Sequence, residues 1–184
     1  MIQKYCFYLR LCKLIYVNSC KRLRLYSSLV KKKIFLLKNQ AILLLGSNLG
    51  QKDHNLQIAK ERIAQSIGEI VGETKKMVSE PWGFLADDEF CNQILVVKTD
   101  KSPMSLLLEI KNLEFSLGRN TSKVEVLDDL IKDGPYQSRI IDVDILYFNS
   151  LSFKSQYLQI PHPLISQRKF VLDLLDQLKL GDLQ

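Results

Sequence analysis

Acidic and apolar residues alternate in one segment near the C-terminal end, and this alternation restricts the fold more than any other feature. Residues 140–148 read IIDVDILYF, which places Asp142 and Asp144 two positions apart. Side chains two apart in a β-strand point to the same face of the sheet. A strand here presents two carboxylates on one face and packs Ile141, Val143 and Ile145 on the other.

Three other segments predict strands of the same sheet. Residues 40–45 form an apolar run that ends in a tight glycine turn at Gly46-Ser47-Asn48-Leu49-Gly50, 90–99 is a strong strand, and 70–79 is a weaker one. Residues 158–160 are a short extended piece before Pro161-His162-Pro163.

Helical spacing of apolar residues predicts the elements between these strands. One helix covers 55–67, with Asp53 and Asn55 as its caps, and a second begins at Pro103 and is closed by Gly118. A third covers 170–178, while 120–138 is a long loop with at most one helical turn, around 126–131. The order β-α-β-β-α-β predicts an α+β fold, a ferredoxin-like antiparallel sheet with helices packed on it.

Charge divides the chain in two. It carries 26 basic and 20 acidic residues, but ten of the basic ones and no acidic one lie within residues 1–38. The remainder therefore has 16 basic against 20 acidic residues. We expect residues 1–38 to be a basic N-terminal extension that is not part of the ordered fold, and 39–184 to be the single domain.

The extension admits three interpretations. A secretory signal needs an uninterrupted apolar stretch, which Arg10 and Lys13 interrupt. The charges of residues 1–38 also exclude a transmembrane helix. A transit peptide fits the missing acids; a non-essential leader or an over-extended start fits slightly better. Only Cys91 lies beyond the extension, with no spacing typical of disulfides or metal ligands, so we expect a cytoplasmic protein that binds no membrane.

The paired carboxylates of Asp142 and Asp144 are the first candidate for a functional site, because they could bind a metal ion. Asp142 and Asp144 repel each other unless a cation joins them, and Mg²⁺ takes one or two carboxylates together with phosphates and water. For the pair alone, a half-exposed strand that shows both aspartates to water is the favoured interpretation. Arg139, His162 and Arg168 could grip phosphate oxygens near the pair, or be solvated surface charges.

An aromatic loop supplies a second candidate site. Glu80-Pro81-Trp82-Gly83-Phe84 precedes Phe90 and Asn92. Flat heterocycles are held by stacking on such rings and by amide hydrogen bonds at their edges. Alternatively, Trp82 and Phe170 cover the core.

In this order the motifs resemble the 6-hydroxymethyl-7,8-dihydropterin pyrophosphokinase family, over about residues 41–174. The most specific match is Ser138-Arg-Ile-Ile-Asp-Val-Asp-Ile-Leu146. The others, in chain order, are Gly46-Ser47-Asn48-Leu49, Glu80-Pro81-Trp82-Gly83, Asn92, Leu117-Gly118-Arg119 and Ile160-Pro161-His162. The resemblance implies transfer of diphosphate from ATP to the pterin's hydroxymethyl group in folate biosynthesis, with AMP as the other product.

The resemblance also implies a role for each site residue. Asp142 and Asp144 hold two Mg²⁺ ions with ATP, and the catalytic residues are Arg119, Arg139, Asp144 and His162. The residues implied for ATP are Glu114, Ile145, Leu158, Ile160, His162 and Arg168. Those implied for the pterin pocket are Ser79, Pro81, Trp82, Phe90, Asn92 and Phe170. The partners expected are small molecules only, ATP and the dihydropterin, and the protein is expected to be a monomer.

Two other functions stay open. Ferredoxin-like domains often bind RNA through the sheet, and the net charge favours this, but the strands lack the paired aromatic and basic residues of a stacking platform. We therefore expect no nucleic acid. The chain could also be an inactive homologue, in which the loop between Arg119 and Arg139 no longer closes over substrates.

Overall fold

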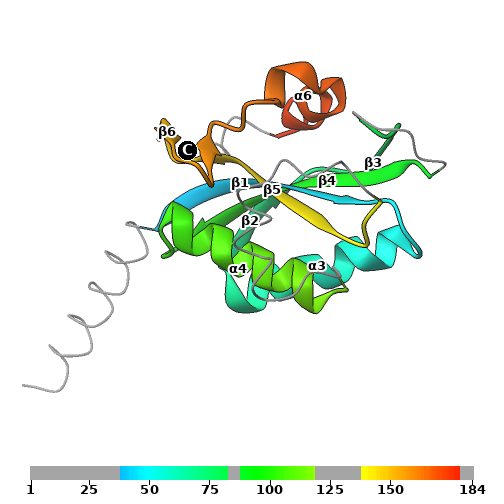
Figure 1. Cartoon of the computed structure of the whole chain (residues 1–184), viewed down its shortest axis with the longest axis horizontal. Coiled ribbons are helices and arrows are strands. Elements are labelled where there is room, and N and C mark those ends of the chain that lie inside the picture. The colour runs from blue at the N-terminus through cyan, green and yellow to red at the C-terminus, as the bar shows by residue number, and fades with distance from the viewer. Residues whose placement is uncertain (1–37, 83–87, 119–137, 179–184) are drawn as a thin grey trace, which may run out of the picture. The chain divides into compact units, whose positions relative to one another are not determined.

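The computed structural model describes residues 38–82, 88–118 and 138–178 (Figure 1). The chain divides into two compact units, Met1–Lys38 and Asn39–Gln184, and the fold below is that of the second unit by itself. Assignment of 1–38 as an extension stays a prediction. The helical turn expected around 126–131 lies outside the described residues.

Five strands form the main described sheet: β1 (Asn39–Ser47), β2 (Glu69–Glu73), β3 (Met77–Ser79), β4 (Phe90–Thr99) and β5 (Asp142–Phe148). Their order is β2-β4-β1-β5, with β3 also on β4, and every pair is antiparallel. The helix between β1 and β2 crosses β4, and the helix between β4 and β5 crosses β1, which makes two split β-α-β units. The predicted ferredoxin-like α+β fold is confirmed.

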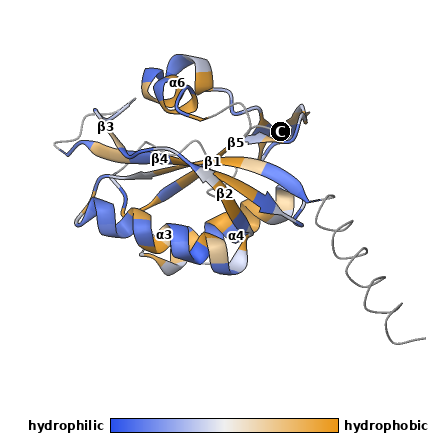
Figure 2. Ribbon diagram, turned by 180° about the vertical axis from the view of Figure 1, so that it is seen from behind, coloured by the Kyte–Doolittle hydropathy of each residue, from blue (hydrophilic) through white to orange (hydrophobic). Residues whose placement is uncertain are grey.

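Helices cover both faces of this sheet. α3 (Lys52–Ser66) and α4 (Pro103–Ser116) lie on one face and α6 (Lys169–Leu175) on the other, with their hydrophobic sides toward the strands (Figure 2). A short 3₁₀ helix, η1 (Ile165–Gln167), precedes α6, and β6 (Phe153–Lys154) pairs with β7 (Gln159–Ile160) in a second small sheet.

β1 and β4 serve two hydrophobic cores at once. In β1, Leu43 and Leu45 face α3 and α4, whereas Ile42 and Leu44 face α6. Nearly every residue of β4 is buried, because this strand is covered on both sides. The same alternation in β5 turns Val143 and Ile145 toward α3 and α4, and so turns Asp142 and Asp144 to the α6 face.

α4 begins and ends as its sequence predicts. Ser102 is the N-cap, and its hydroxyl oxygen accepts a hydrogen bond from Ser105 N at 3.3 Å, while Pro103 occupies the first turn. The chain leaves the helix at Gly118, whose φ of +107° is unfavourable for residues with a side chain.

Three local predictions are wrong. α3 is not capped by Asp53 or Asn55: its N-cap is Gln51, which makes no side-chain cap bond. The predicted strand 70–79 is broken at Thr74, because the backbone N of this buried residue donates to Ile94 O and its hydroxyl oxygen, not its carbonyl, accepts from Ile94 N. β1 does not end before Gly46 but continues through Ser47.

Candidate functional site

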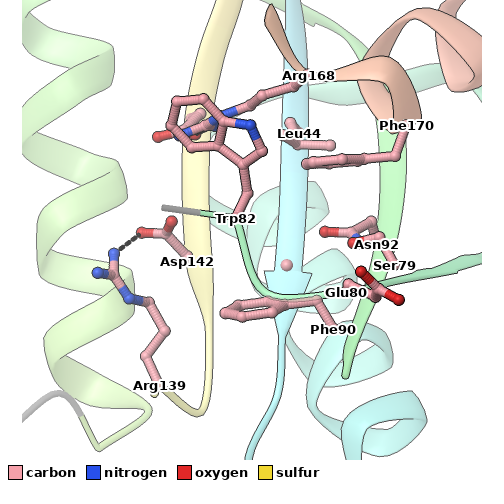
Figure 3. A pocket seen from close by; sticks show the side chains of 12 residues that line it. Leu44, Ser79, Glu80, Trp82, Phe90, Asn92, Arg139, Asp142, Arg168 and Phe170 are labelled. Carbon is pink, nitrogen blue, oxygen red and sulfur yellow. Dashed lines mark hydrogen bonds and ion pairs between the residues drawn. The ribbon is translucent and has the colours of Figure 1, made fainter. Parts of the chain in front are cut away.

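A pocket opens on the α6 face of the sheet, where β5 lies across β1 from β4 (Figure 3). Its lining comes from five separate stretches of the chain. The lining residues are Leu44, Gly46, Ser79, Glu80, Trp82, Phe90, Asn92, Arg139, Asp142, Asp144, Arg168 and Phe170.

Strand register builds the floor of the pocket. Gly46 of β1 pairs with Asn92 of β4 on one side and with Asp142 of β5 on the other, so these residues form one row across the sheet. A Cβ atom added at Gly46 would lie 3.2 Å from Asn92 Oδ1 and 3.6 Å from the ring of Phe90. The missing side chain leaves the middle of the row open for a ligand.

One end of the pocket is aromatic. The rings of Trp82, Phe90 and Phe170 lie around the same opening, and Asn92 lies beside it (Figure 3). Asn92 is 3% exposed, and its Nδ2 donates to Ser79 Oγ at 2.9 Å and to Met77 O at 3.4 Å. These bonds fix the amide orientation, so the pocket offers apolar faces and one fixed amide edge, as a flat heterocycle requires.

The other end carries two aspartate–arginine pairs. Arg139 Nη1 lies 2.7 Å from Asp142 Oδ1, and Arg168 Nη1 lies 3.0 Å from Asp144 Oδ2. The guanidinium of Arg168 also stacks on Trp82, 5.0 Å from the ring centroid. This stack links the aromatic end of the pocket to the acidic end.

Arg139 is held from the turn after β1. Its backbone N donates to Asn48 Oδ1 at 2.7 Å, and its carbonyl accepts from Asn48 N at 3.2 Å. Burial by itself lowers the pKa of the Arg139 guanidinium, but the charges of Asp142, Glu114 and Asp144 outweigh burial and raise that pKa above its ordinary value. The turn predicted at 46–50 therefore also positions this arginine.

His162 lies beside the acidic end but not in the pocket lining. It follows a cis Ile160–Pro161 peptide; its N donates to Leu146 O at 2.9 Å, and its Nδ1 accepts from Leu164 N at 3.2 Å. Burial lowers the pKa of the imidazole, and the positive charge of Arg168 lowers it further against the opposing effect of Asp144 and Asp142. The neutral imidazole is favoured.

The structure brings most of the predicted site together. All predicted pterin residues except Pro81 line the pocket, as do Asp142, Asp144, Arg139 and Arg168. Glu114, Ile145 and Ile160 are buried away from it, and Leu158 packs against the α3–α4 core. Proximity of Glu114 and of the backbone at 158–160 to the nucleoside stays a prediction. Arg119 lies outside the described residues.

Three residues that line the pocket are not among the site residues predicted from the sequence: Leu44, Gly46 and Glu80. Gly46 was interpreted as part of a turn. The period of two along a strand could have identified it: if the strand is extended from Leu45 to Ser47, Gly46 lies on the same face as Leu44.

The two aspartates suit a magnesium ion bound with phosphates. Among the residues that the structure describes, no group of three or more His, Cys, Asp or Glu side chains could hold a metal. Mg²⁺ does not need such a cage, since it is usually bound by one or two carboxylates plus substrate phosphates and water. The same part of the chain contains no helix long and apolar enough to cross a membrane.

The fold and the pocket together define an α+β protein with a pocket in which aromatic rings and a fixed amide adjoin paired carboxylates and arginines. The family model described as 7,8-dihydro-6-hydroxymethylpterin-pyrophosphokinase matches residues 42–180. The chain belongs to this family, and is thus a pyrophosphokinase, an enzyme that transfers a diphosphate group.

Curated relatives agree with the family match. The "Folic acid synthesis protein FOL1" of Dictyostelium discoideum is 38% identical over 135 residues, which are 73% of this chain but 19% of that protein. A protein of Porphyromonas gingivalis named 2-amino-4-hydroxy-6-hydroxymethyldihydropteridine pyrophosphokinase is 32% identical over 69% of this chain and 82% of its own length. An Aquifex aeolicus protein of the same name is 33% identical over 68% of this chain and 71% of its own length.

Solved structures share the fold. A structure titled "Crystal Structure Analysis of the HPPK-DHPS in complex with substrates" matches with a TM-score of 0.54 at 14% identity, over 77% of this chain and 40% of that one. The Plasmodium falciparum HPPK-DHPS with pteroate matches with a TM-score of 0.54 at 18% identity, over 76% of this chain and 38% of that one. The chain therefore spans less than half of the length of these structures.

Proposed function

We propose that this chain transfers diphosphate from ATP to 6-hydroxymethyl-7,8-dihydropterin in folate synthesis, and that the pocket on the α6 face is where it does so. The observation that carries the proposal is the juxtaposition in one pocket of three aromatic rings with a fixed amide and, across Gly46, two carboxylates paired with arginines. A flat substrate in the cavity would extend its hydroxymethyl group toward Asp142 and Asp144.

Asn92, Phe90 and Phe170 support the pterin assignment. The Asn92 amide is fixed by Ser79 and is buried at the level of Gly46, so it can read the hydrogen-bonding edge of a heterocycle. Phe90 and Phe170 supply the faces on which the ring stacks, and they also exclude water from the reacting hydroxyl.

Asp142 and Asp144 support the ATP assignment. Their two carboxylates, on one strand face and only partly exposed, are ligands of the type that Mg²⁺ takes when it also binds phosphates. We propose two such ions, which when bound would neutralise phosphate charge and polarise the attacking oxygen. Arg139, Arg168 and His162 would bind phosphate oxygens, as would Arg119.

The reaction requires positioning and charge neutralisation rather than a covalent intermediate. The substrate hydroxyl oxygen forms a bond to the β-phosphorus of ATP, the bond from that phosphorus to the α,β-bridging oxygen breaks, and AMP leaves with the negative charge. The hydroxyl proton passes to solvent or to a neighbouring carboxylate such as Asp144. Arg139 and Arg168 stabilise charge that develops on the phosphate oxygens.

An assay for AMP release tests the proposal. The full chain, ATP, Mg²⁺ and the dihydropterin should give AMP and the pterin diphosphate, and Asp142→Asn or Asp144→Asn should lower turnover by about 100-fold or more. Asp173→Asn is the matched control, because it makes the same change at an exposed aspartate on α6; this variant should be fully active. No AMP release by the wild-type chain would indicate the inactive homologue, and normal turnover of both variants would refute the assigned site.

We also propose that the protein acts as a cytoplasmic monomer that needs neither nucleic acid nor membrane. Light scattering of the eluted protein should give the mass of one chain, and a dimer mass would contradict this.

A further inference from the structure

A buried carboxylate lies behind the two pocket aspartates, on the opposite face of the sheet. Glu114, in the last turn of α4, is 0% exposed. Its Oε1 accepts a hydrogen bond at 2.9 Å from the backbone N of Val143, the residue between Asp142 and Asp144. Lys111 Nζ lies 3.1 Å and 2.9 Å from the two carboxylate oxygens.

The position of Val143 in the sheet explains why this bond matters. β5 is the last strand in the described order, and β1 is its neighbour there. A backbone N–H on the outer edge of such a strand has no strand to accept its hydrogen bond, and a buried N–H without an acceptor costs about 1–3 kcal/mol. Glu114 supplies this acceptor for Val143, the residue that links Asp142 to Asp144 in the chain.

The stability of the fold does not by itself require a carboxylate at position 114. A buried ion pair is often no more stabilising than apolar side chains of the same volume, because both charges must be desolvated. A neutral amide at the same position could also accept from Val143. A carboxylate makes a shorter and stronger bond to a backbone N–H than a neutral acceptor does, which restricts the Val143 backbone more tightly.

Glu114 is also close enough to influence the site electrostatically. Burial lowers the pKa of the Arg139 guanidinium, and the negative charge of Glu114 is among those that raise it. The carboxylate is thus coupled to the Arg139–Asp142 pair although it does not line the pocket.

We propose that Glu114 is a positioning residue for the divalent cation that binds with the nucleotide: by holding the Val143 N–H it fixes the directions of the Asp142 and Asp144 carboxylates. This inference rests on the proposed function, since it concerns the metal that ATP brings. It gives Glu114 a role distinct from the nucleoside contact implied by the resemblance.

Three substitutions separate the hydrogen bond from the charge. Glu114→Gln keeps an acceptor of the same length without the charge. Glu114→Met has a similar length but offers no comparable acceptor, and Glu114→Asp keeps the charge but is too short by one methylene to reach Val143 in the same way. If the hydrogen bond is what positions the aspartates, Gln, whose neutral acceptor is weaker, should preserve most of the metal affinity, and both Met and Asp should lower that affinity further.

The readout is Mn²⁺ affinity, from electron paramagnetic resonance of free Mn²⁺ with the full chain and saturating α,β-methylene-ATP. Substitutions behind metal ligands typically lower metal affinity by about 10- to 100-fold. We expect a loss in that range for Glu114→Met and Glu114→Asp, and a loss of under about fivefold for Glu114→Gln. Pterin affinity, measured by calorimetry, should stay within about twofold in all three.

Thr99→Val is the matched control, because it removes another buried hydrogen bond, from Thr99 Oγ1 to Ile67 O at 2.6 Å, at the far end of β4. It should lower stability without changing Mn²⁺ affinity. Wild-type Mn²⁺ affinity in Glu114→Asp, which retains the charge and is the mildest change if Glu114→Met does not fold, would overturn the inference. So would a parallel loss of Mn²⁺ and pterin affinity, or a Gln variant as weak as Met.

Failure of the proposed function gives a different result. In that case the wild-type chain itself would bind neither the ATP analogue with Mn²⁺ nor the pterin. A wild-type chain that binds both, with variants that bind Mn²⁺ equally well, would overturn only the role of Glu114.

Discussion

Each pocket aspartate already has a cation beside it. Arg139 pairs with Asp142 and Arg168 with Asp144, so two adjacent carboxylates are tolerated without a metal. Under the proposed function, nucleotide binding exchanges partners: the carboxylates turn to magnesium and the arginines to phosphate. Such an exchange creates little new charge in the pocket, so the binding free energy need not offset a large desolvation cost.

Gly46 gives a steric prediction. In Gly46→Ala the new Cβ would lie 3.2 Å from Asn92 Oδ1 and would occupy the space between Asn92 and Asp142. Since one misplaced methyl in a packed site costs about 1–3 kcal/mol, we expect pterin affinity to fall about tenfold or more by calorimetry. Affinity for α,β-methylene-ATP serves as the internal control and should change little; an unchanged pterin affinity would contradict the placement of the ring.

His162 gives a pH prediction for stability. Burial lowers its pKa in the folded chain below the unfolded value of 6.5, so the unfolded chain takes up the proton more readily. Stability that depends on the neutral imidazole is fully present above that value and is lost as pH falls through the folded pKa. Urea unfolding in EDTA from about pH 7.5 to 5 should therefore show a smaller loss of stability for His162→Gln than for the wild type.

The other histidine in the chain provides the comparison. His54 is exposed on α3, and His54→Gln should follow the wild-type profile. Identical slopes for the wild type and His162→Gln would show that the environment of His162 does not favour the neutral form.

At the scale of elements, α4 positions Glu114 and depends on its N-cap. Ser102→Ala removes the acceptor for Ser105 N, and loss of such a cap typically costs about 1 kcal/mol. Urea unfolding should show this loss with no change in the m-value. Ser105→Ala, on an exposed position of the same turn, should be neutral or slightly stabilising because alanine is the better helix former.

Elements whose signals are local could be predicted from the sequence. β4 was predicted with its observed bounds because the run Ile94-Leu95-Val96-Val97 at its centre is typical of a buried strand, and α4 because Pro103 and Gly118 mark its ends. The break at Thr74 could not be predicted, since it depends on hydrogen bonds to Ile94 on another strand. Asn55 did not act as a cap because its side chain donates to Ser47 Oγ and Leu49 O instead.

The site followed the same division. Asp142 and Asp144 were found because a period of two within one strand determines that they share a face. The row formed by Asn92, Gly46 and Asp142 was not, because it depends on the register of β1 with two strands from distant segments. Glu114 could not be placed from sequence for the same reason: its partner Val143 is 29 residues away.

At the scale of the whole molecule, the uneven charge predicts two separable behaviours. Residues 39–184 should fold alone and release AMP at the rate of the full chain, because the pocket lining lies entirely within them. Any salt-sensitive RNA binding of the full chain should disappear with residues 1–38, which carry ten basic and no acidic residues. Circular dichroism, the AMP assay and filter binding test this; tight RNA binding by 39–184 would favour the RNA-binding alternative.

The stack of Trp82 on Arg168 has an optical consequence, because Trp82 is the only tryptophan of the chain. Indole emission from this protein therefore comes from a single ring at the border between the aromatic and acidic ends of the pocket. A phosphate that draws Arg168 away from Asp144 also changes what lies over that ring, so titration with α,β-methylene-ATP should shift or quench the emission without any added label. The protein would thereby report occupancy of its own nucleotide site in real time, even under conditions in which no product forms.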